Sequence, residues 1–548
     1  MHTPGLYWRT IRHLKARQIF GRLWFRLYRP RPNLSPAPPL RAPTGTWIEP
    51  AQHASSMTGA NALVFLNEAG MLDPKRSDGG WDDPARSKLW RYNLHYFDDL
   101  SAEKASKWRD WHTGLIGHWL RHNPPGHGTG WEPFPTSLRI VNWIKTAQNG
   151  FTLPADALHS LAVQTRWLSR RVEHHLSGNH LLANAKALCF AGAFFKGAEA
   201  DAWFKQGSEI LKRELPSQIL PDGGHYELSP MYHALVLEDL LDLNNLCRRF
   251  GMDRALQGLL EAQISPMRTW LAALSHPDGE IAFFNDAAIG IAPTLAVLNA
   301  YAERLGFAPA AASSHGPTHL HQSGYVRLAR GPAVLLIDAA EVGPAHQPGH
   351  AHADILSFEL SLHGERVLVN GGTSEYGTGP ERLRQRGTEA HNTLTINGLN
   401  SSEVWSGFRV GRRAYPRDLQ IVQSDDDTSV TAAHDGYRFL PGSPKHHRSW
   451  RLKSQTLTIQ DRVTGPLREA EAHYHFAPGI RLHADETGGF AERDGRLVLR
   501  WEILKGRARI EPDTHHPRFG LSLPTQRLTL VCDDNRATLR LIFVGGGT

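Results

Sequence analysis

The spacing of apolar residues in this 548-residue chain changes near residue 322, and this change limits the folds it can adopt. Before that point, apolar side chains recur every three or four residues, as in residues 181–191, which is the period of amphipathic helices. After it, apolar and polar residues alternate, as in residues 357–362, which is typical of strands. A chain of this length exceeds one ordinary core, so we expect at least two domains.

The first half predicts successive helices between residues 51 and 305. Their apolar stripes fall at residues 115–120, 158–168, 181–191, 235–246, 255–274 and 291–305. Turn formers such as Asn149-Gly150 and Pro277-Asp278-Gly279 separate the stripes. This rhythm favours paired antiparallel helices arranged as an (α/α) toroid or solenoid, although no strict residue repeat is present.

The second half predicts many short strands between residues 322 and 548. Candidate strands lie at residues 325–328, 357–362, 366–369, 455–459, 473–476, 497–501, 528–531 and 538–544, with a hairpin turn at residues 362–366. Such a series indicates an antiparallel β-sandwich. Residues 306–321, rich in Ala, Ser, Gly and Pro, are the expected linker, so the predicted fold class is an α+β multidomain protein.

Residues 1–50 combine a basic amphipathic segment with a Pro-rich linker over residues 29–50. The segment lacks the uninterrupted apolar run of a secretory signal, and no later stretch is long enough for a transmembrane segment, so a cytoplasmic location is favoured. Its basic helix could make a peripheral contact with an anionic membrane, or could simply pack on the next domain.

The composition bears on partners. A formal charge of +7 would attract nucleic acid, anionic membranes or acidic polysaccharides. The basic residues are spread out and form no recognition motif, so nucleic-acid binding is not expected. The 16 Trp and 31 His residues suit stacking and hydrogen bonding with sugars. The three Cys residues form no C-x-x-C pair and therefore indicate neither a disulfide framework nor a zinc ribbon.

A His-x-His motif at the entry of a candidate strand concentrates chemistry. His350 and His352 precede Asp354 and then an alternating run. Two histidines so close can converge, with one ring free for proton transfer and the other able to ligate a cation. A solvated His-rich loop is the alternative.

The helical half contributes two further polar motifs, residues 177–184 and 221–233. Each opens a helix. Asn179 and His180 could act in catalysis or could simply cap a helix, and Tyr232 could act in catalysis or belong to the core.

Five motifs in this order resemble those of the heparinase II/III-type polysaccharide lyases. They are residues 90–96, 178–182, 222–233, 350–354 and 389–393, and the resemblance covers most of the chain beyond about residue 85. It is similar both to glycosaminoglycan lyases of broad range and to heparinase-like proteins found with polysaccharide-assembly enzymes. The resemblance implies a helical toroid followed by an antiparallel β domain.

The resemblance also implies a reaction. Such lyases cleave uronic-acid-containing polysaccharides, including heparan sulfate, hyaluronan, chondroitin or alginate, by β-elimination that leaves a 4,5-unsaturated uronate. Removing the C5 proton requires that charge developing on the uronate carboxylate be stabilised. We expect Asn179 and His180 or His350 to hold that carboxylate. Tyr232 would take the C5 proton or donate one to the leaving oxygen, and His350 could lower the tyrosine pKa or act as the base itself.

A divalent metal ion, Mn or Zn, is expected from the same resemblance. Its ligands would be His352, Asn370 and His391, where Asn370 occupies a position at which relatives carry an acid. The ion would hold the loop that presents His350, a structural role, because elimination consumes no water.

Expected substrate contacts come from polar segments that should line one end of the toroid and from a loop before His391. They are Asn93, His95, Trp131, Glu132, Arg139, Arg384 and Arg386. Each arginine could bind carboxylate or sulfate, or could form a surface ion pair. Two other functions stay open: a glycoside hydrolase that uses Glu132, Glu227 and Asp286, or a non-catalytic polysaccharide-binding or assembly protein.

Overall fold

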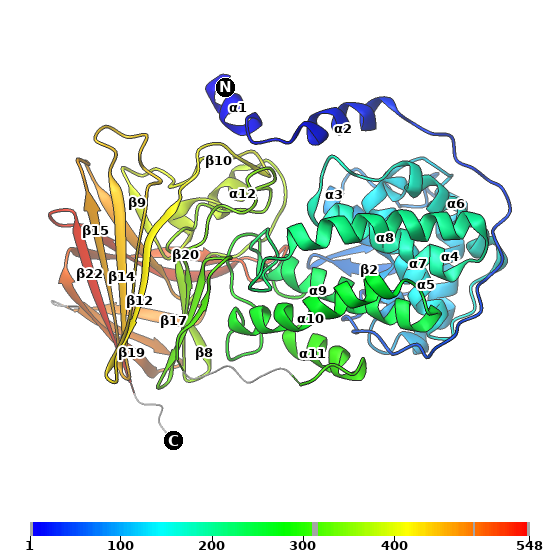
Figure 1. Cartoon of the computed structure of the whole chain (residues 1–548). Coiled ribbons are helices and arrows are strands. Elements are labelled where there is room, and N and C mark those ends of the chain that lie inside the picture. The colour runs from blue at the N-terminus through cyan, green and yellow to red at the C-terminus, as the bar shows by residue number, and fades with distance from the viewer. Residues whose placement is uncertain (1–3, 310–315, 486–487, 545–548) are drawn as a thin grey trace.

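The computed structural model describes residues 4–309, 316–485 and 488–544. A helical domain and a β domain lie side by side, and two N-terminal helices lie above the place where the domains meet (Figure 1). The expected linker at residues 306–321 falls between the last helix of the first domain and the first strand of the second; its residues 310–315 are outside the described residues.

The helical domain consists of helices that pack largely against their neighbours in sequence. They are α3 (Lys88–Tyr96), α4 (Arg109–His122), α5 (Pro133–Gln148), α6 (Ala155–Arg170), α7 (Gly178–Phe194), α8 (Ala198–Gln218), α9 (Pro230–Phe250), α10 (Arg254–Ala273) and α11 (Leu295–Arg304). Helix α7 is buried along almost its whole length, because Leu, Ala and Phe cover every side of it. The predicted helical architecture is confirmed.

One part of the first half departs from the expected helices. Strands β1 (Met57–Gly59), β2 (Ala62–Phe65) and β3 (Glu68–Met71) form a small antiparallel sheet. The turn between β2 and β3 places Leu66 and Asn67 at positive φ, a conformation that suits tight hairpins. This sheet packs on α3, where Phe65 meets Trp90 edge to face.

The β domain contains three larger antiparallel sheets, which confirms the predicted class. The first is β4 (Thr318–Leu320), β5 (Tyr325–Arg330), β6 (Ala333–Asp338), β7 (Phe358–Leu362) and β8 (Glu365–Leu368). The second joins β20 (Arg507–His515), β21 (Leu523–Val531), β16 (Ala470–His475) and β9 (Leu394–Ile396). The third runs in the order β12 (Pro416–Gln423), β13 (Asp427–His434), β14 (Lys445–Lys453), β15 (Thr456–Thr464), β22 (Arg536–Phe543), β19 (Arg496–Lys505), β18 (Gly488–Arg493) and β17 (Ile480–Ala484).

Side chains from all three sheets share one apolar core, so the domain is a layered sandwich. The expected hairpin is present, because β7 and β8 pair across the turn at His363 and Gly364. Two short strands, β10 (Val404–Trp405) and β11 (Arg409–Val410), and helix α12 (Pro380–Gln385) belong to the long connections of this domain.

A separate apolar cluster joins the two domains. Trp270 and Leu274, at the end of α10, pack with Tyr325 and Leu336 of the first sheet. The Trp270 indole also donates to Ser323 Oγ at 2.8 Å. Because burial of large apolar side chains is strongly favourable, this contact holds the first sheet of the β domain against the end of α10.

The N-terminal segment forms α1 (Pro4–Ile11) and α2 (Ala16–Leu27), followed by an extended Pro-rich stretch. That stretch is held to the helical domain by backbone hydrogen bonds, including Arg41 N to Phe194 O at 2.8 Å. Among the residues that the structure describes, no helix has both the length and the apolar character that crossing a membrane requires.

Candidate active site

The two halves of the chain meet at Tyr232 and His350. Tyr232 lies in the first turn of α9, where the Ser229 hydroxyl caps the helix by accepting from the Tyr232 backbone N–H. His350 lies in the long loop between β6 and β7. Their ring centroids are 3.9 Å apart with the rings tilted by 32°, so the predicted convergence of the two domains is present.

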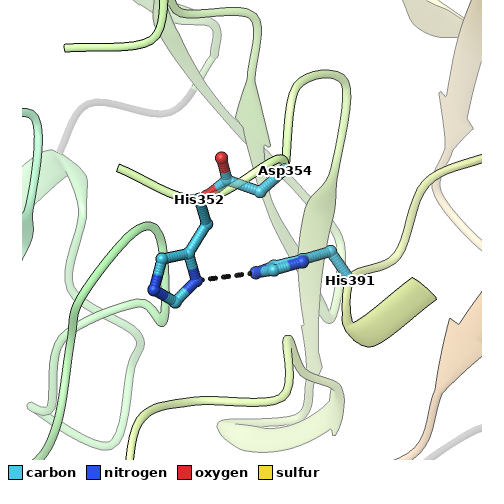
Figure 2. A group of neighbouring side chains, drawn as sticks. All are labelled: His352, Asp354 and His391. Carbon is cyan, nitrogen blue, oxygen red and sulfur yellow. Dashed lines mark hydrogen bonds between the residues drawn. The ribbon is translucent and has the colours of Figure 1, made fainter. Parts of the chain in front are cut away.

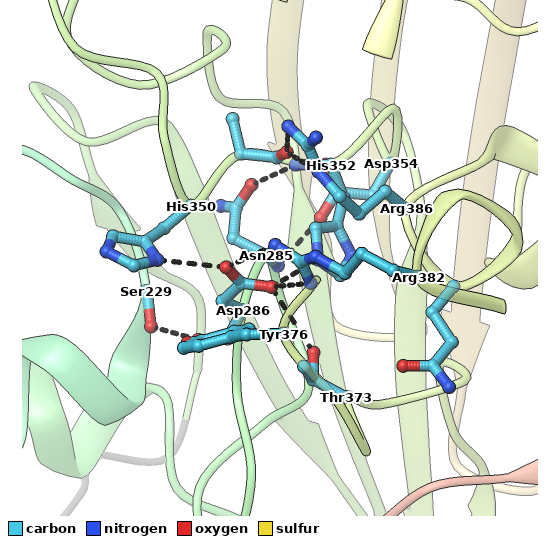
Figure 3. Close-up of polar contacts among 12 residues, drawn as sticks. Ser229, Asn285, Asp286, His350, His352, Asp354, Thr373, Tyr376, Arg382 and Arg386 are labelled. Carbon is cyan, nitrogen blue, oxygen red and sulfur yellow. Dashed lines mark hydrogen bonds and ion pairs between the residues drawn. The ribbon is translucent and has the colours of Figure 1, made fainter. Parts of the chain in front are cut away.

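A single buried carboxylate, Asp286, organises the histidines of the His-x-His motif (Figure 3). Its Oδ2 lies 2.9 Å from His350 Nδ1, and its Oδ1 lies 2.9 Å from His352 Nε2. Arg382 of α12 contacts both oxygens, with Nη2 donating to Oδ2 at 2.7 Å. Burial alone would raise the pKa of Asp286, but Arg382 and the two histidines hold it well below its usual value.

Asp286 determines which nitrogen of His350 can take up a proton. An ionised carboxylate only accepts hydrogen bonds, so His350 Nδ1 must carry the hydrogen and Nε2 is left with its lone pair. The His350 side chain keeps 16% of its surface exposed, whereas Asp286 has none. The arrangement is therefore suited to a base whose free nitrogen is oriented by a buried acid.

The surroundings of Tyr232 favour the protonated phenol. Its hydroxyl lies 2.9 Å from that of Tyr376, which comes from the β domain. Burial raises the pKa of Tyr232, and the negative charge of Asp286 raises it further, which outweighs the opposing effect of the Tyr376 hydrogen bond. The phenol therefore stays protonated over the ordinary pH range, the reverse of what a tyrosine base needs.

Glu227 contributes a second buried carboxyl that the lyase interpretation of the sequence missed. Its Oε2 lies 3.7 Å from His350 Nε2, and neither oxygen makes an ordinary hydrogen bond with any described residue. The carboxyl packs against the backbone at Gly178, where an added Cβ would lie 2.2 Å from Oε1. Burial raises the pKa of Glu227, and His350 and His180 offset part of that rise.

Asn179 and His180 lie at the start of α7, beside Glu227. Asn179 is half-buried, and its backbone N–H faces the Glu227 carboxyl. His180 stacks on Phe134 at 4.2 Å between centroids and places Nδ1 3.2 Å from Glu173 Oε2. Burial would lower the pKa of His180, but the Glu173 carboxylate raises it above its usual value. The structure thus gathers all four predicted catalytic residues at one junction.

Backbone strain accompanies these positions. Ser177, Leu228 and Asn285 all have φ between 57° and 59°, in the left-handed region that residues with a Cβ rarely adopt. They flank Asn179, Glu227 and Asp286 respectively. Such strained residues tend to gather where surrounding structure fixes a functional geometry.

The predicted metal ligands His352 and His391 face each other (Figure 2). His352 Nδ1 lies 3.1 Å from His391 Nε2, and His391 Nδ1 donates to Gly387 O at 2.7 Å. Since His352 Nε2 donates to Asp286, the facing nitrogens would both present lone pairs, an arrangement that a cation between them relieves. Asp354 completes a buried group whose candidate ligand atoms all lie within 4.8 Å of one another.

Asn370, the third predicted ligand, has other partners. Its Oδ1 accepts from the Asn392 backbone N–H at 3.0 Å, and its Nδ2 donates to Ser357 Oγ at 3.3 Å. The resemblance implies Asn370 because relatives carry an acidic ligand at that position, whereas Asp354 lies in the same motif as His352. Ligation by Asn370 stays a prediction.

Four of the predicted substrate contacts have side chains that are buried and already bonded within the protein. His95 accepts from the Trp119 indole at 3.1 Å, and the Trp131 indole donates to Asn123 O at 3.1 Å. Arg139 donates to Gly130 O at 2.8 Å and lies over the Trp119 ring. These three belong to the aromatic core of the toroid.

Arg386 is the fourth. It is fully buried, and it donates through Nε and Nη2 to Ala351 O, between the two histidines of the motif, at 3.1 and 2.9 Å. Burial lowers its pKa to about 9. Arg386 therefore positions the loop that carries His350 and His352.

The remaining predicted contacts are at least partly exposed. Asn93 donates to Leu89 O within its own helix at 2.8 Å. Glu132 contacts the Tyr92 hydroxyl and pairs with Lys88 at 2.9 Å. Arg384 pairs with Glu381 at 2.7 Å. Their roles toward a substrate stay predictions.

Comparisons with known proteins agree with this architecture. The family profile described as Heparinase II/III N-terminus matches residues 86–312, and the profile described as Heparinase II/III-like, C-terminal, matches residues 312–540. A heparin-sulfate lyase from Bacteroides stercoris is 27% identical over 392 residues, covering 66% of this chain and 56% of that protein. One from Pedobacter heparinus is 25% identical over 352 residues, covering 58% of this chain and 51% of that protein. The chain spans about half the length of these curated relatives.

Solved structures show the same fold. A crystal structure of heparinase III superposes with a TM-score of 0.65 at 18% identity, covering 98% of this chain and 86% of that chain. Heparan sulfate lyase HepC from Pedobacter heparinus superposes with a TM-score of 0.59 at 19% identity, covering 85% of this chain and 79% of that chain.

Proposed function

This chain belongs to the heparinase II/III-like family, and on that premise we propose that it is a polysaccharide lyase that cleaves uronate-containing polysaccharides by β-elimination. The observation that carries the proposal is the close contact of the Tyr232 and His350 rings, one from each domain, with Asp286 bonded to His350 Nδ1. A hydrogen-bonded base and a protonated phenol on one side of a sugar are what an elimination needs.

In the proposed reaction, His350 Nε2 takes the C5 proton of the uronate. The electron pair of that C–H bond forms the C4–C5 double bond as the bond from C4 to the leaving oxygen breaks. Tyr232 donates its proton to that oxygen, and the two residues are reset by net transfer of the proton from His350 to Tyr232. The raised pKa of Tyr232 supports its role as the acid.

Asn179 and His180 are proposed to stabilise the uronate carboxylate, on which charge develops as the C5 proton leaves. Asn179 offers an amide donor, and His180 offers an imidazole whose pKa is raised by Glu173. Both lie at the N-terminal end of α7, where the helix dipole also favours negative charge.

His352, His391 and Asp354 fit a divalent metal ion, either Zn or Mn, since two imidazoles and a carboxylate suit both. When bound, the ion supplies positive charge that ties the two histidine-bearing loops together. The residues themselves position His350, because His352 shares Asp286 with it. We propose this structural role, with Asn370 as a further candidate ligand.

The hydrolase alternative lacks support from the geometry. Asp286, one of its candidate carboxylates, is fully buried and saturated by Arg382 and two histidines, so it is not available to attack a sugar. Glu132 is committed to Lys88 and Tyr92. A non-catalytic role would give no function to the contact between Tyr232 and His350.

The proposed substrates are acidic polysaccharides, and heparan sulfate is the first to test because the matched relatives are named heparin-sulfate lyases. Hyaluronan, chondroitin and alginate complete the panel, each with manganese or zinc supplied. Elimination leaves an unsaturated uronate that absorbs in the ultraviolet, so absorbance should rise with wild-type protein and not with Tyr232→Phe. Binding without any rise, under every metal condition, would favour the non-catalytic alternative.

A further inference from the structure

Helix α2 is amphipathic, but its apolar face is turned toward solvent, whereas an ordinary surface helix turns its apolar face toward the core. Its inner face is formed by Gln18, Gly21 and Phe25: Gly21 and Phe25 contact the helical domain, whereas Gln18 contacts the β6–β7 loop of the β domain. The Gln18 amide donates to His346 O at 3.1 Å, Gly21 lies against His175, and Phe25 packs on the His175 ring at 4.6 Å. A polar and a small residue thus occupy the inner face, where apolar side chains normally lie.

The apolar residues of α2 other than Phe25 point largely to solvent. Ile19, Phe20, Leu23, Trp24 and Leu27 are 49%, 71%, 58%, 64% and 73% exposed. Their spacing places all five on one stripe of the helix, opposite the inner face. An exposed apolar surface of this continuity is uncommon in a protein that has no partner for it.

Helix α1 extends this surface onto the β domain. It is fastened by buried Leu6, by an ion pair between Arg9 and Glu403 at 2.6 Å, and by the Trp405 indole, which donates to Thr10 Oγ1 at 3.0 Å. Trp8 and Ile11 remain 68% and 44% exposed. Both helices lie on the same side of the molecule, above the junction of the two domains (Figure 1).

The charged side chains of the N-terminal segment itself are all basic. Residues 1–48 contain nine Lys and Arg residues and no Asp or Glu. Arg22 and Arg26 flank the apolar stripe and form no ion pair with any residue that the structure describes. Burial, together with the charges of Arg409 and Arg26, lowers the pKa of Arg22, as expected for cations gathered without counter-ions.

We propose that the outward faces of α1 and α2 form a docking surface for anionic lipid membranes. The apolar stripe would enter the boundary between headgroups and acyl chains, and the flanking arginines would contact lipid phosphates. Tryptophan and arginine suit this position, since both place an apolar body beside a polar end. Because α1 is fixed to the β domain and α2 to the helical domain, docking would hold both domains at the surface.

The charge decides between a lipid surface and a second copy of this chain. Two copies meeting through these helices would bring together two sets of unpaired arginines, and like charges repel. An anionic surface would neutralise them. The proposal is independent of the lyase reaction, since none of these residues belongs to the proposed active site.

Co-sedimentation of the full chain with vesicles tests the proposal. Vesicles of phosphatidylcholine with about one third phosphatidylglycerol should bind the wild-type protein, and pure phosphatidylcholine should bind it much more weakly. The double variant Leu23→Asp/Trp24→Asp should lose affinity by at least about tenfold. Arg22→Gln/Arg26→Gln should weaken binding several-fold, with a smaller salt dependence.

Val422→Asp is the matched control, because Val422 is 63% exposed on an edge strand far from α2 in sequence. It should bind vesicles as the wild type does, and thermal melts should show every variant folded. Absence of binding to phosphatidylglycerol vesicles, equal binding to both vesicle types, or wild-type binding by Leu23→Asp/Trp24→Asp would overturn the proposal. So would a sedimentation-velocity dimer that this variant dissociates while vesicles stay unbound.

Discussion

Replacing Asp286 by Asn tests the carboxylate that bonds both histidines and Arg382, with almost no change in side-chain shape. The carboxylate accepts from His350, His352 and Arg382, whereas an amide has one oxygen and an N–H₂ group that must face another donor. Arg382 is fully buried, so removing its counter-charge should cost about 3–5 kcal/mol of unfolding free energy. The loss of the hydrogen bond that fixes the His350 tautomer should lower kcat by about 10³- to 10⁴-fold.

Both effects are measurable on one preparation. Urea unfolding gives the stability change, and ultraviolet absorbance with excess polysaccharide gives kcat for the folded fraction. Asp278→Asn is the matched control: Asp278 pairs with Arg366 at 2.6 Å, but its side chain is 35% exposed, so the change should cost about 1 kcal/mol or less. If Asp286→Asn retained activity within tenfold of wild type, the proposed orientation of His350 by Asp286 would be refuted.

Four further changes separate the roles of neighbouring residues. Tyr232→Phe should abolish cleavage while changing substrate affinity only a few-fold, since it removes the phenolic proton and one hydrogen bond to Tyr376. Turnover retained by this variant would contradict the role of Tyr232 as the acid. His350→Ala should likewise abolish turnover but not binding by calorimetry, and full activity would exclude it as the base. Burial raises the pKa of Glu227, so the folded protein keeps this carboxyl protonated to higher pH than the unfolded chain does. The free energy of unfolding should therefore fall as pH rises from the unfolded to the folded pKa of Glu227, and Glu227→Gln should remove that fall. Urea midpoints that change in parallel for both proteins from pH 4 to 8 would count against this prediction. His352→Ala should lower metal content and melting temperature together, and an unchanged metal stoichiometry would argue against the ligand set.

The sequence predicted the architecture because periodicity is local information. The change of apolar spacing near residue 322 marks where helices end and strands begin, and the motifs around Asn179, Tyr232 and His350 are short enough to be recognised one by one. Asp286 was named only as a candidate hydrolase carboxylate. It lies in a segment between α10 and α11 without apolar periodicity, and its role comes entirely from contacts with residues 64 to 96 positions away.

Burial of individual side chains is the feature of the site that the sequence shows least well. His95 and Arg139 belong to polar-looking motifs, yet a backbone carbonyl and an aromatic face satisfy Arg139 inside the toroid. The Gly130 carbonyl precedes α5 and Trp119 lies on α4, so the pattern of the helix that carries Arg139 does not show these partners. The same limit applies to α2: its pattern predicts an amphipathic helix, but only the folded contacts show that Trp24 and its neighbours face outward.

The central claim is that the junction of Tyr232 and His350 performs an elimination, and digestion in water labelled with heavy oxygen tests it most directly. Elimination consumes no water, so mass spectrometry of the products should show no heavy oxygen and chain ends lighter by one water than hydrolysis gives. One labelled oxygen for each bond cleaved, carried by the new reducing end, with no ultraviolet absorbance, would contradict the account and identify the protein as a hydrolase.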